Sequence, residues 1–186
     1  MLILASQSPR RRELLGRIGL EFTVRAADID ETMDENDPPE VAVARISAKK
    51  AAAVEADESD VVLAADTIVV LDGAVLGKPK DAADAARMLR MLAGRTHRVM
   101  TGVTVRRGDK YETRVETTDV TFRPLREKEI AAYVATGEPM DKAGAYGVQG
   151  KASIFVSGLR GDYFNVMGLP LCLTAELLRT FGVEVF

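Results

Sequence analysis

Apolar residues follow two different spacings along this chain, and the spacing predicts which segments are strands and which are helices. Uninterrupted apolar runs are typical of buried strands, whereas apolar residues that recur every three or four positions are typical of helices. The predicted strands cover residues 2–5, 22–24, 61–71, 74–76, 99–105 and 111–122. The predicted helices cover residues 9–19, 39–56, 81–94, 126–135 and 171–181. Together they predict an α/β or α+β fold with a mixed sheet.

The first predicted strand leads directly into a helix whose opening turn carries an unusual charge. Ser8 followed by Pro9 predicts an N-cap with proline at the first helical position. Arg10 and Arg11, with a third arginine after them, then lie where the helix macrodipole is already positive. Free backbone N–H groups, the hydroxyls of Ser6 and Ser8, and guanidinium groups favour a bound phosphate. The alternative is a basic helix exposed on the surface.

A carboxylate interrupts the most apolar of the predicted strands. Asp66 and Thr67 lie inside the run 61–71. Burying a carboxylate is unfavourable unless it is paired or coordinates a metal, so Asp66 is the strongest catalytic candidate. The alternative is an aspartate in a turn that accepts hydrogen bonds from nearby backbone N–H groups.

Charged residues in three other segments are candidates for binding an ion. Glu31 directly follows a strand-like segment, where a rigidly held carboxylate can bind a cation. Lys49 and Lys50 project about 100° apart on their helix, so only one of them can face a given site. Periodicity does not choose between these two lysines. Lys78 ends a predicted hairpin, from which its ammonium can reach a phosphate.

Two glycine-rich loops follow the fourth predicted helix. The first covers residues 137–150, and its glycines let the backbone approach a ligand closely. Within it, Gln149 offers an amide that can both donate to and accept from the edge of a nucleobase. The second loop covers residues 158–170 and precedes the last predicted helix.

Composition and charge narrow the class of protein. The 186 residues, 47% of them hydrophobic, suffice for one domain or two small lobes. A net charge of −3 argues against a protein that coats nucleic acid, and no apolar run approaches the roughly 20 residues that span a bilayer. We therefore expect a cytoplasmic protein. Cys172 is expected in the core, and the single histidine, His97, argues against a histidine-based metal site or catalytic triad.

Short motifs occur in a fixed order along nearly the whole chain. They are Ser6-Gln7-Ser8-Pro9-Arg10-Arg11, Asp30-Glu31-Thr32, Lys50-Ala51, Ala65-Asp66-Thr67, Gly77-Lys78-Pro79, residues 141–150 and residues 165–170. In this order they resemble the Maf (septum-formation) nucleotide pyrophosphatases. The resemblance implies a single domain over residues 1–186, with an elongated, two-lobed α/β fold and a central cleft, related to the inosine-triphosphate pyrophosphatases. It also implies hydrolysis of a nucleoside triphosphate between the α and β phosphates, with Mg²⁺ or Mn²⁺.

The resemblance further implies a role for each candidate residue. Asp66 would be the base that activates water and, with Glu31, would hold the metal. Lys50 is favoured over its neighbour. The residues expected to bind the substrate are Ser6, Ser8, Arg10, Arg11, Lys50, Thr67, Lys78 and Gln149. Among these, Thr67 and Gln149 resemble the residues found at these positions in the branch of the family that acts on dTTP and UTP.

Two positions depart from the family pattern, and alternative functions stay open. Asp162 stands where serine is common and can alter the substrate range, and Met167 stands where valine is usual. One alternative is a pyrophosphatase of 7-methyl-GTP or other modified nucleotides. Another is a nucleotide-binding regulator of cell division with incidental hydrolysis. The expected partner is a nucleoside triphosphate, with no nucleic acid and no membrane; a homodimer and a monomer are both open.

Overall fold

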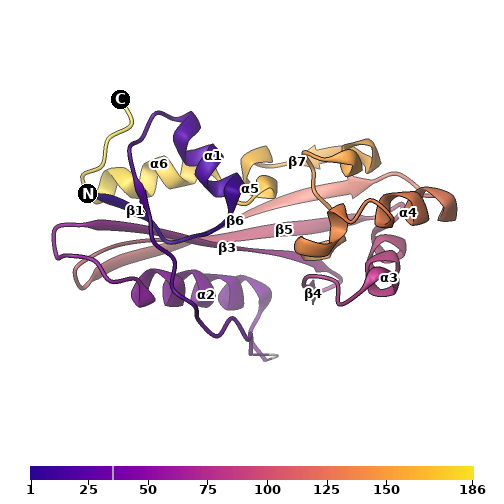
Figure 1. Cartoon of the computed structure of the whole chain (residues 1–186), viewed down its shortest axis with the longest axis horizontal. Helices are drawn as coiled ribbons and strands as arrows, with labels where there is room; N and C mark the ends of the chain where they lie inside the picture. Colours follow the sequence, from indigo (N-terminus) through magenta and orange to yellow (C-terminus); the bar gives the residue numbers. More distant parts are fainter. Residues whose placement is uncertain (35) are drawn as a thin grey trace. The chain divides into compact units, whose positions relative to one another are not determined.

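A computed structural model describes residues 1–34 and 36–186 of the chain (Figure 1). The strands are β1 (Leu2–Leu4), β2 (Thr23–Val24), β3 (Val61–Leu71), β4 (Ala74–Leu76), β5 (Thr96–Arg107), β6 (Lys110–Phe122) and β7 (Val156–Arg160). The α-helices are α1 (Pro9–Arg17), α2 (Pro39–Ala53), α3 (Ala82–Leu92), α4 (Glu127–Val134), α5 (Tyr163–Met167) and α6 (Leu171–Thr180). Short 3₁₀ turns are η1 (Glu138–Asp141), η2 (Ala143–Ala145) and η3 (Lys151–Phe155).

The strands form one sheet that contains parallel and antiparallel pairs. The strand order is β2-β1-β3-β5-β6-β7, and β4 pairs with β3 outside this path. Strand β1 is parallel to β2 and β3, with Ile3 opposite Thr23 and Val62. Strand β4 is antiparallel to β3, and β7 is antiparallel to β6. The prediction of an α/β fold with a mixed sheet is confirmed.

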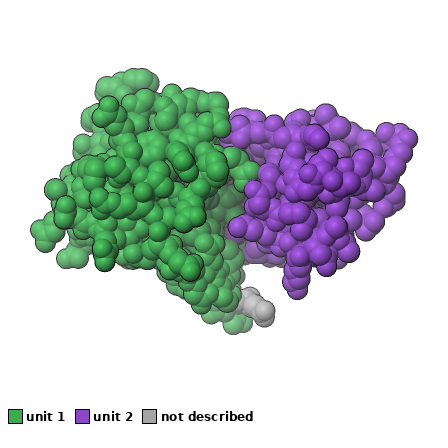
Figure 2. Space-filling model, in the orientation of Figure 1, with its two compact units in different colours: residues 1–67, 101–116, 168–186 green, residues 68–100, 117–167 purple. Residues whose placement is uncertain are grey.

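The chain divides into two compact units (Figure 2). Unit 1 contains residues 1–67, 101–116 and 168–186, and unit 2 contains residues 68–100 and 117–167. The division falls inside β3, β5 and β6, so each of these long strands contributes residues to both units. Two units agree with the predicted two lobes. The elongated shape, the central cleft and the single domain stay predictions.

Unit 1 is built around its parallel strands. In Figure 1, α1 and α6 lie on one side of these strands and α2 lies on the other. Burying an aliphatic side chain such as valine or isoleucine stabilises the fold by about 1.5–3 kcal/mol. One buried cluster joins the C-terminal end of α2 to the sheet and contains Ile3, Ala5, Ala51, Val54, Val62 and Ala64.

At Gly102, strand β5 approaches α2 so closely that no side chain fits between them. A Cβ atom added at Gly102 would lie 2.6 Å from the carbonyl oxygen of Val43 and 3.1 Å from the Cα atom of Ala44. Both are backbone atoms inside a helix, so neither can move aside alone. Gly102 therefore sets how deeply α2 sits on the sheet.

Two polar contacts hold α2 along the same strand. The Thr104 and Ser47 hydroxyl oxygens are 2.8 Å apart. The Arg106 guanidinium donates to the carbonyl oxygens of Ala51 (3.0 Å) and Val54 (2.8 Å), near the helix end where carbonyls lack intrahelical partners. Because side chains alternate along a strand, Thr104 and Arg106 share one face of β5. These contacts fix the register of α2 against β5.

Unit 2 contains a buried aromatic cluster. The His97 ring packs edge-on against Phe122 and Tyr146, with centroids 5.1 and 5.4 Å away. Its Nε2 atom lies 2.7 Å from the Tyr146 hydroxyl oxygen. Burial lowers the pKa of His97 to about 4. His97 is therefore a neutral packing residue near pH 7.

The structure corrects three expectations from the sequence. Glu31 does not directly follow a strand, because β2 ends at Val24. The second predicted loop, 158–170, contains most of β7 and all of α5, because an exposed edge strand and a five-residue helix show little apolar periodicity. Cys172 is exposed, not part of the core; it lies beside Leu171, whose side chain is among those that α6 buries. No helix among the described residues is long and apolar enough to cross a membrane.

Candidate active site

The start of α1 folds as its sequence predicts. Ser8 is the N-cap, and its side-chain oxygen accepts a hydrogen bond from the backbone N–H of Arg11. The Ser6 hydroxyl oxygen accepts from the Ser8 backbone N–H at 3.2 Å. The first turn contains no acidic residue, so no residue of that turn offsets its positive charge.

The Arg11 side chain is buried and binds three neutral oxygen atoms. Its Nε donates to the Gly168 carbonyl at 2.8 Å, and its terminal nitrogens donate to Thr67 Oγ1 (3.0 Å) and Ser6 Oγ (3.4 Å). Burial lowers the pKa of Arg11, while the negative charges of Asp66 and Glu31 act in the opposite direction. A guanidinium stays charged in proteins. Arg11 therefore places a cation inside unit 1 and ties the start of α1 to β3.

A second group of predicted site residues meets at Lys50. The Lys50 ammonium lies 2.7 Å from Asp66 Oδ1 and 3.0 Å from Glu31 Oε1. The exposed fractions of the side chains are 14% for Lys50, 11% for Asp66 and 58% for Glu31. Lys49, next to Lys50, is exposed. The structure thus places Lys50, not Lys49, against the candidate catalytic carboxylate.

The remaining predicted residues differ in their surroundings. Thr67 accepts from Arg11 and lies 2.9 Å from the hydroxyl oxygen of Thr101, a fully buried residue of β5 that the sequence did not single out. Arg10 is half-buried, and no hydrogen bond or ion pair with another described residue is found for its side chain. Lys78 and Gln149 belong to unit 2, where both are exposed.

The glycine-rich loop around Gln149 is organised by a carboxylate that the sequence prediction missed. Glu138 accepts hydrogen bonds from the Tyr133 hydroxyl (3.0 Å) and the Lys151 backbone N–H (3.2 Å). A Cβ atom at Gly150 would collide with the Glu138 carboxylate. This glycine therefore makes room for a side chain of the same loop. The only sequence signal for Glu138 is its place among closely spaced glycines.

Asp162 caps a helix. Its Oδ1 atom accepts from the backbone N–H groups of Phe164 (2.7 Å) and Asn165 (3.2 Å), at the start of α5. Serine caps helices in the same way. If serine is common at this position, as the resemblance implies, Asp162 can replace it as an N-cap. An effect on substrate range stays a prediction.

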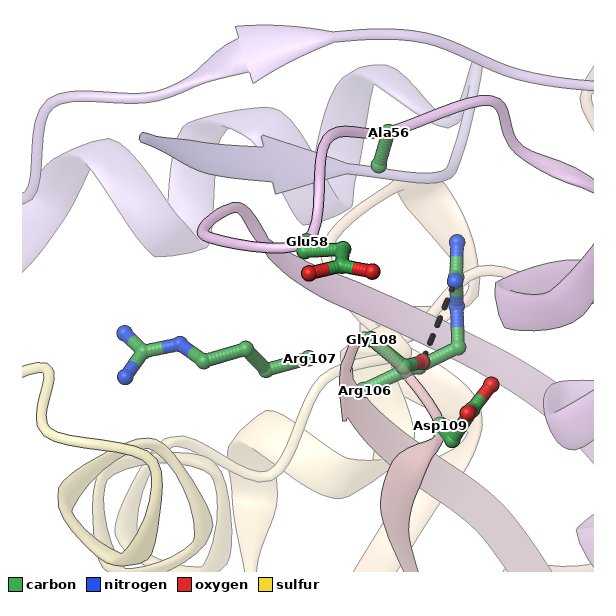
Figure 3. A pocket seen from close by; sticks show the side chains of 6 residues that line it. All are labelled: Ala56, Glu58, Arg106, Arg107, Gly108 and Asp109. Atoms are coloured by element: carbon green, nitrogen blue, oxygen red, sulfur yellow. Dashed lines mark hydrogen bonds between the residues drawn. The ribbon is translucent and has the colours of Figure 1, made fainter.

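A surface hollow of about 550 Å³ lies elsewhere in unit 1, at the turn between β5 and β6 (Figure 3). The Arg106 guanidinium in it donates to the Gly108 carbonyl as well as to α2. Figure 3 shows two carboxylates beside the two arginines, so the hollow has no clear excess of either charge. None of its residues is a predicted site residue; the lining consists of Ala56, Glu58, Arg106, Arg107, Gly108 and Asp109.

The carboxylates fit a hard divalent cation. Among the described residues there is no group of three or more acidic, histidine or cysteine side chains that could hold a metal ion. Mg²⁺, however, commonly binds one or two carboxylates and completes its shell with water and substrate phosphates. Glu31 and Asp66, whose oxygen atoms converge on one ammonium, supply such a pair.

Comparison with known proteins assigns the family. The sequence model of the Maf-like proteins matches residues 1–181. This chain belongs to the Maf family. A dTTP/UTP pyrophosphatase of Moorella thermoacetica is 55% identical over 189 residues, which cover 100% of this chain and 97% of that protein. A dTTP/UTP pyrophosphatase of Bacillus pumilus is 48% identical and covers 100% of this chain and 98% of that protein.

A weaker likeness exists among solved structures. A HAM1 protein from Coxiella burnetii aligns with a TM-score of 0.46 and 17% sequence identity, over 82% of this chain and 90% of that chain. The relation to the inosine-triphosphate pyrophosphatases stays a prediction.

Proposed function

We propose that this chain hydrolyses dTTP and UTP between the α and β phosphates, giving the nucleoside monophosphate and pyrophosphate. Relatives that are 55% and 48% identical over the whole chain bear the name dTTP/UTP pyrophosphatase. The observation that carries the proposal is the pairing of Lys50, on α2, with Asp66, which lies inside the apolar strand β3. This pair supplies the base and the positive charge that hydrolysis of an anhydride needs.

Asp66 is the proposed general base. Its carboxylate accepts the proton of the attacking water as the anhydride bond breaks and pyrophosphate leaves. A positioned base typically contributes about 10²–10⁴ in rate. The burial of Asp66 supports this role, because a buried carboxylate has few waters around it and keeps a defined orientation.

The cations of the site are proposed to bind the phosphate chain. Arg10 and Lys78 have no hydrogen bond or ion pair with another described residue that would compete with a phosphate. Arg11 uses three of the five N–H donors of a guanidinium for Gly168, Thr67 and Ser6. The remaining donors of Arg11 are available to a phosphate oxygen. Ser6 and Ser8 belong to the same proposed substrate site.

We propose Mg²⁺ or Mn²⁺ as the cofactor, held by Glu31 and Asp66. The cation would neutralise negative charge on the phosphates during hydrolysis. Oxygen ligands suit both ions. Support comes from the two carboxylates that meet at one point in unit 1.

Recognition of the base is proposed for Gln149, and Thr67 is proposed as a further substrate-binding residue. Uracil and thymine present carbonyl acceptors on either side of an N–H donor, and a neutral amide can donate to one carbonyl and accept from that N–H. We further propose that residues 1–186 act as a single cytoplasmic domain, as a monomer or homodimer. No nucleic-acid or membrane partner is proposed.

A panel of nucleoside triphosphates tests the function. Pyrophosphate release is measured with Mg²⁺ and with Mn²⁺ for dTTP, UTP, CTP, GTP and 7-methyl-GTP. We expect the highest kcat/KM for dTTP and UTP. A preference for 7-methyl-GTP would assign the chain to the modified-nucleotide alternative. Tight nucleotide binding without pyrophosphate release would favour the nucleotide-binding regulator.

A further inference from the structure

In unit 1, the ammonium of Lys50 bridges two carboxylates, those of Glu31 and Asp66. Lys50 donates to Asp66 at 2.7 Å and lies 3.0 Å from Glu31. The Lys50 side chain is only 14% exposed, so its ammonium has given up much of its contact with water. The carboxylate oxygens compensate for this loss. The two acids are therefore held together by a cation that belongs to the chain itself.

The same oxygen atoms are the proposed ligands of the divalent cation. An ammonium and a divalent cation repel each other, so a metal ion bound at these carboxylates weakens their hold on Lys50. Lys50 is also one of the residues proposed to bind the phosphate chain. Two of the three N–H donors of its ammonium face Glu31 and Asp66, so Lys50 must leave these carboxylates to offer all three donors to the phosphates.

We propose that Lys50 is a placeholder cation: it occupies the metal position between Glu31 and Asp66 in the ligand-free protein and leaves these oxygens when the divalent cation binds. The freed ammonium then turns to the phosphates of the substrate. This inference rests on the metal site of the proposed function. It adds that the metal and the lysine compete for one position.

The surroundings of Lys50 favour a movement of the side chain alone. Helix α2 carries Lys50. Its backbone packs directly against Gly102, and hydrogen bonds at Ser47 and from Arg106 hold it to β5. A rigid shift of the helix would disturb all of these contacts. Lysine has a flexible four-carbon stem and a compact charge, so that rotation about its side-chain bonds suffices. An arginine here would be held by its planar, forked geometry.

Metal affinity without nucleotide tests the placeholder. Lys50→Met removes the charge and keeps an unbranched apolar stem. We expect it to bind Mn²⁺ roughly tenfold more tightly than the wild type, because a competing cation is gone. Lys49→Met is the matched control, since Lys49 is exposed on the neighbouring position of the same helix. It should bind Mn²⁺ within about twofold of the wild type, as a distant and solvated charge is screened.

The experiment titrates the nucleotide-free, full-length protein with Mn²⁺ and follows the free ion by its electron paramagnetic resonance signal. Thermal unfolding of each variant verifies that it is folded, and Lys50→Gln serves as a second uncharged variant if Lys50→Met is not. Tighter binding in the uncharged variant supports the placeholder. Unchanged or weaker binding overturns it, because Lys50 would then assemble the carboxylates for the metal without occupying their site.

Two further variants separate this inference from the proposed function. Glu31→Gln and Asp66→Asn should each weaken Mn²⁺ binding. If neither does, these carboxylates are not the metal ligands, and both the metal site and the placeholder fall. If the wild type releases pyrophosphate from dTTP while the uncharged Lys50 variant binds Mn²⁺ no more tightly, the proposed function stands and only the placeholder is lost.

Discussion

The polar residues of unit 1 and the carboxylate of the glycine-rich loop of unit 2 differ in how far along the chain their partners lie. In unit 1 the decisive contacts join distant parts of the chain, as from Arg11 to Gly168 and from Lys50 to Asp66. In unit 2 the carboxylate of the loop around Gln149 is held by near neighbours, since Glu138 bonds Tyr133 and Lys151. The same loop also contacts distant residues, because the Gly144 N–H donates to the Gly77 carbonyl and the Tyr146 hydroxyl lies 2.7 Å from His97. Charge chemistry in unit 1 thus depends on the tertiary fold, whereas the charged group of the loop depends mainly on residues near it in the sequence.

The difference predicts where mutations act. A change to the long-range contacts of unit 1 should alter both the free energy of unfolding and the rate of hydrolysis, because the same atoms contribute to both. A change to the exposed amide of Gln149 should alter selectivity and leave stability nearly intact.

The largest effect is expected for Asp66→Asn. The amide is nearly the same size but cannot accept the proton, so kcat for pyrophosphate release should fall by about 10²–10⁴. Circular dichroism is expected to show the wild-type secondary structure. A folded variant with near wild-type turnover would make Asp66 a structural residue, and unit 1 would then lose its proposed base.

Gly102→Ala tests whether the close contact between β5 and α2 controls the proposed active site, which it does not touch. The added Cβ would meet the Val43 carbonyl oxygen at 2.6 Å, so α2 must shift. We expect a loss of about 1–3 kcal/mol in the free energy of unfolding. A displacement of about 1 Å can also cost up to 10²-fold in rate.

Gly16→Ala is the matched control, because a Cβ there meets no atom within 4 Å. It should keep full activity and gain up to about 1 kcal/mol, as alanine is the better helix former. Normal activity and stability in Gly102→Ala would show that the helix is not seated at this point.

Gln149→Glu addresses the loop of unit 2. A carboxylate can only accept hydrogen bonds and would repel a carbonyl of the base. A carbonyl of the bound base that is left without a donor costs about 1–3 kcal/mol, so kcat/KM for dTTP should fall roughly five- to hundredfold. Inhibition by inorganic tripolyphosphate, which has no base, should change little. Equal losses for dTTP and tripolyphosphate would remove base recognition from Gln149.

Arg10→Ala and Arg11→Ala separate two residues that the sequence treats alike. Both should weaken triphosphate use. Only Arg11→Ala should lower the free energy of unfolding, by roughly 1.5–3 kcal/mol, because its charged hydrogen bonds are lost. Arg10→Ala relieves an unfavourable dipole interaction of about 0.3–1 kcal/mol. Urea unfolding of the nucleotide-free proteins measures both, and equal stability of the two variants would contradict the buried role of Arg11.

The smallest effect concerns acid stability in unit 2. The folded-state pKa of His97, about 4, lies below its usual value. The unfolded chain therefore takes up a proton first, and stability falls as the pH drops through the window between about 6.5 and 4. Between pH 7 and pH 5 the wild type should lose about 2 kcal/mol more than His97→Gln. Parallel pH profiles of the two proteins would contradict a buried neutral histidine.

The sequence predicted the parts of the site that depend on local pattern. An acid inside an apolar run identified Asp66, and Ser8-Pro9 identified the start of α1. Pairings between distant segments have no local signal. Nothing near Arg11 in the sequence indicates that its guanidinium will be buried and will donate to the Gly168 carbonyl. Glu138 was missed for another reason, since the loop glycines suggested room for a ligand and the space is filled by a side chain of the loop.

The products formed from dTTP test the central claim most directly. Wild-type protein is incubated with dTTP and Mg²⁺ or Mn²⁺, and nucleotides and phosphates are separated and quantified. Hydrolysis between the α and β phosphates predicts thymidine monophosphate and pyrophosphate in equal amounts, with neither formed by Asp66→Asn at a comparable rate. Thymidine diphosphate with inorganic phosphate, or products that form equally well with Asp66→Asn, would contradict the account.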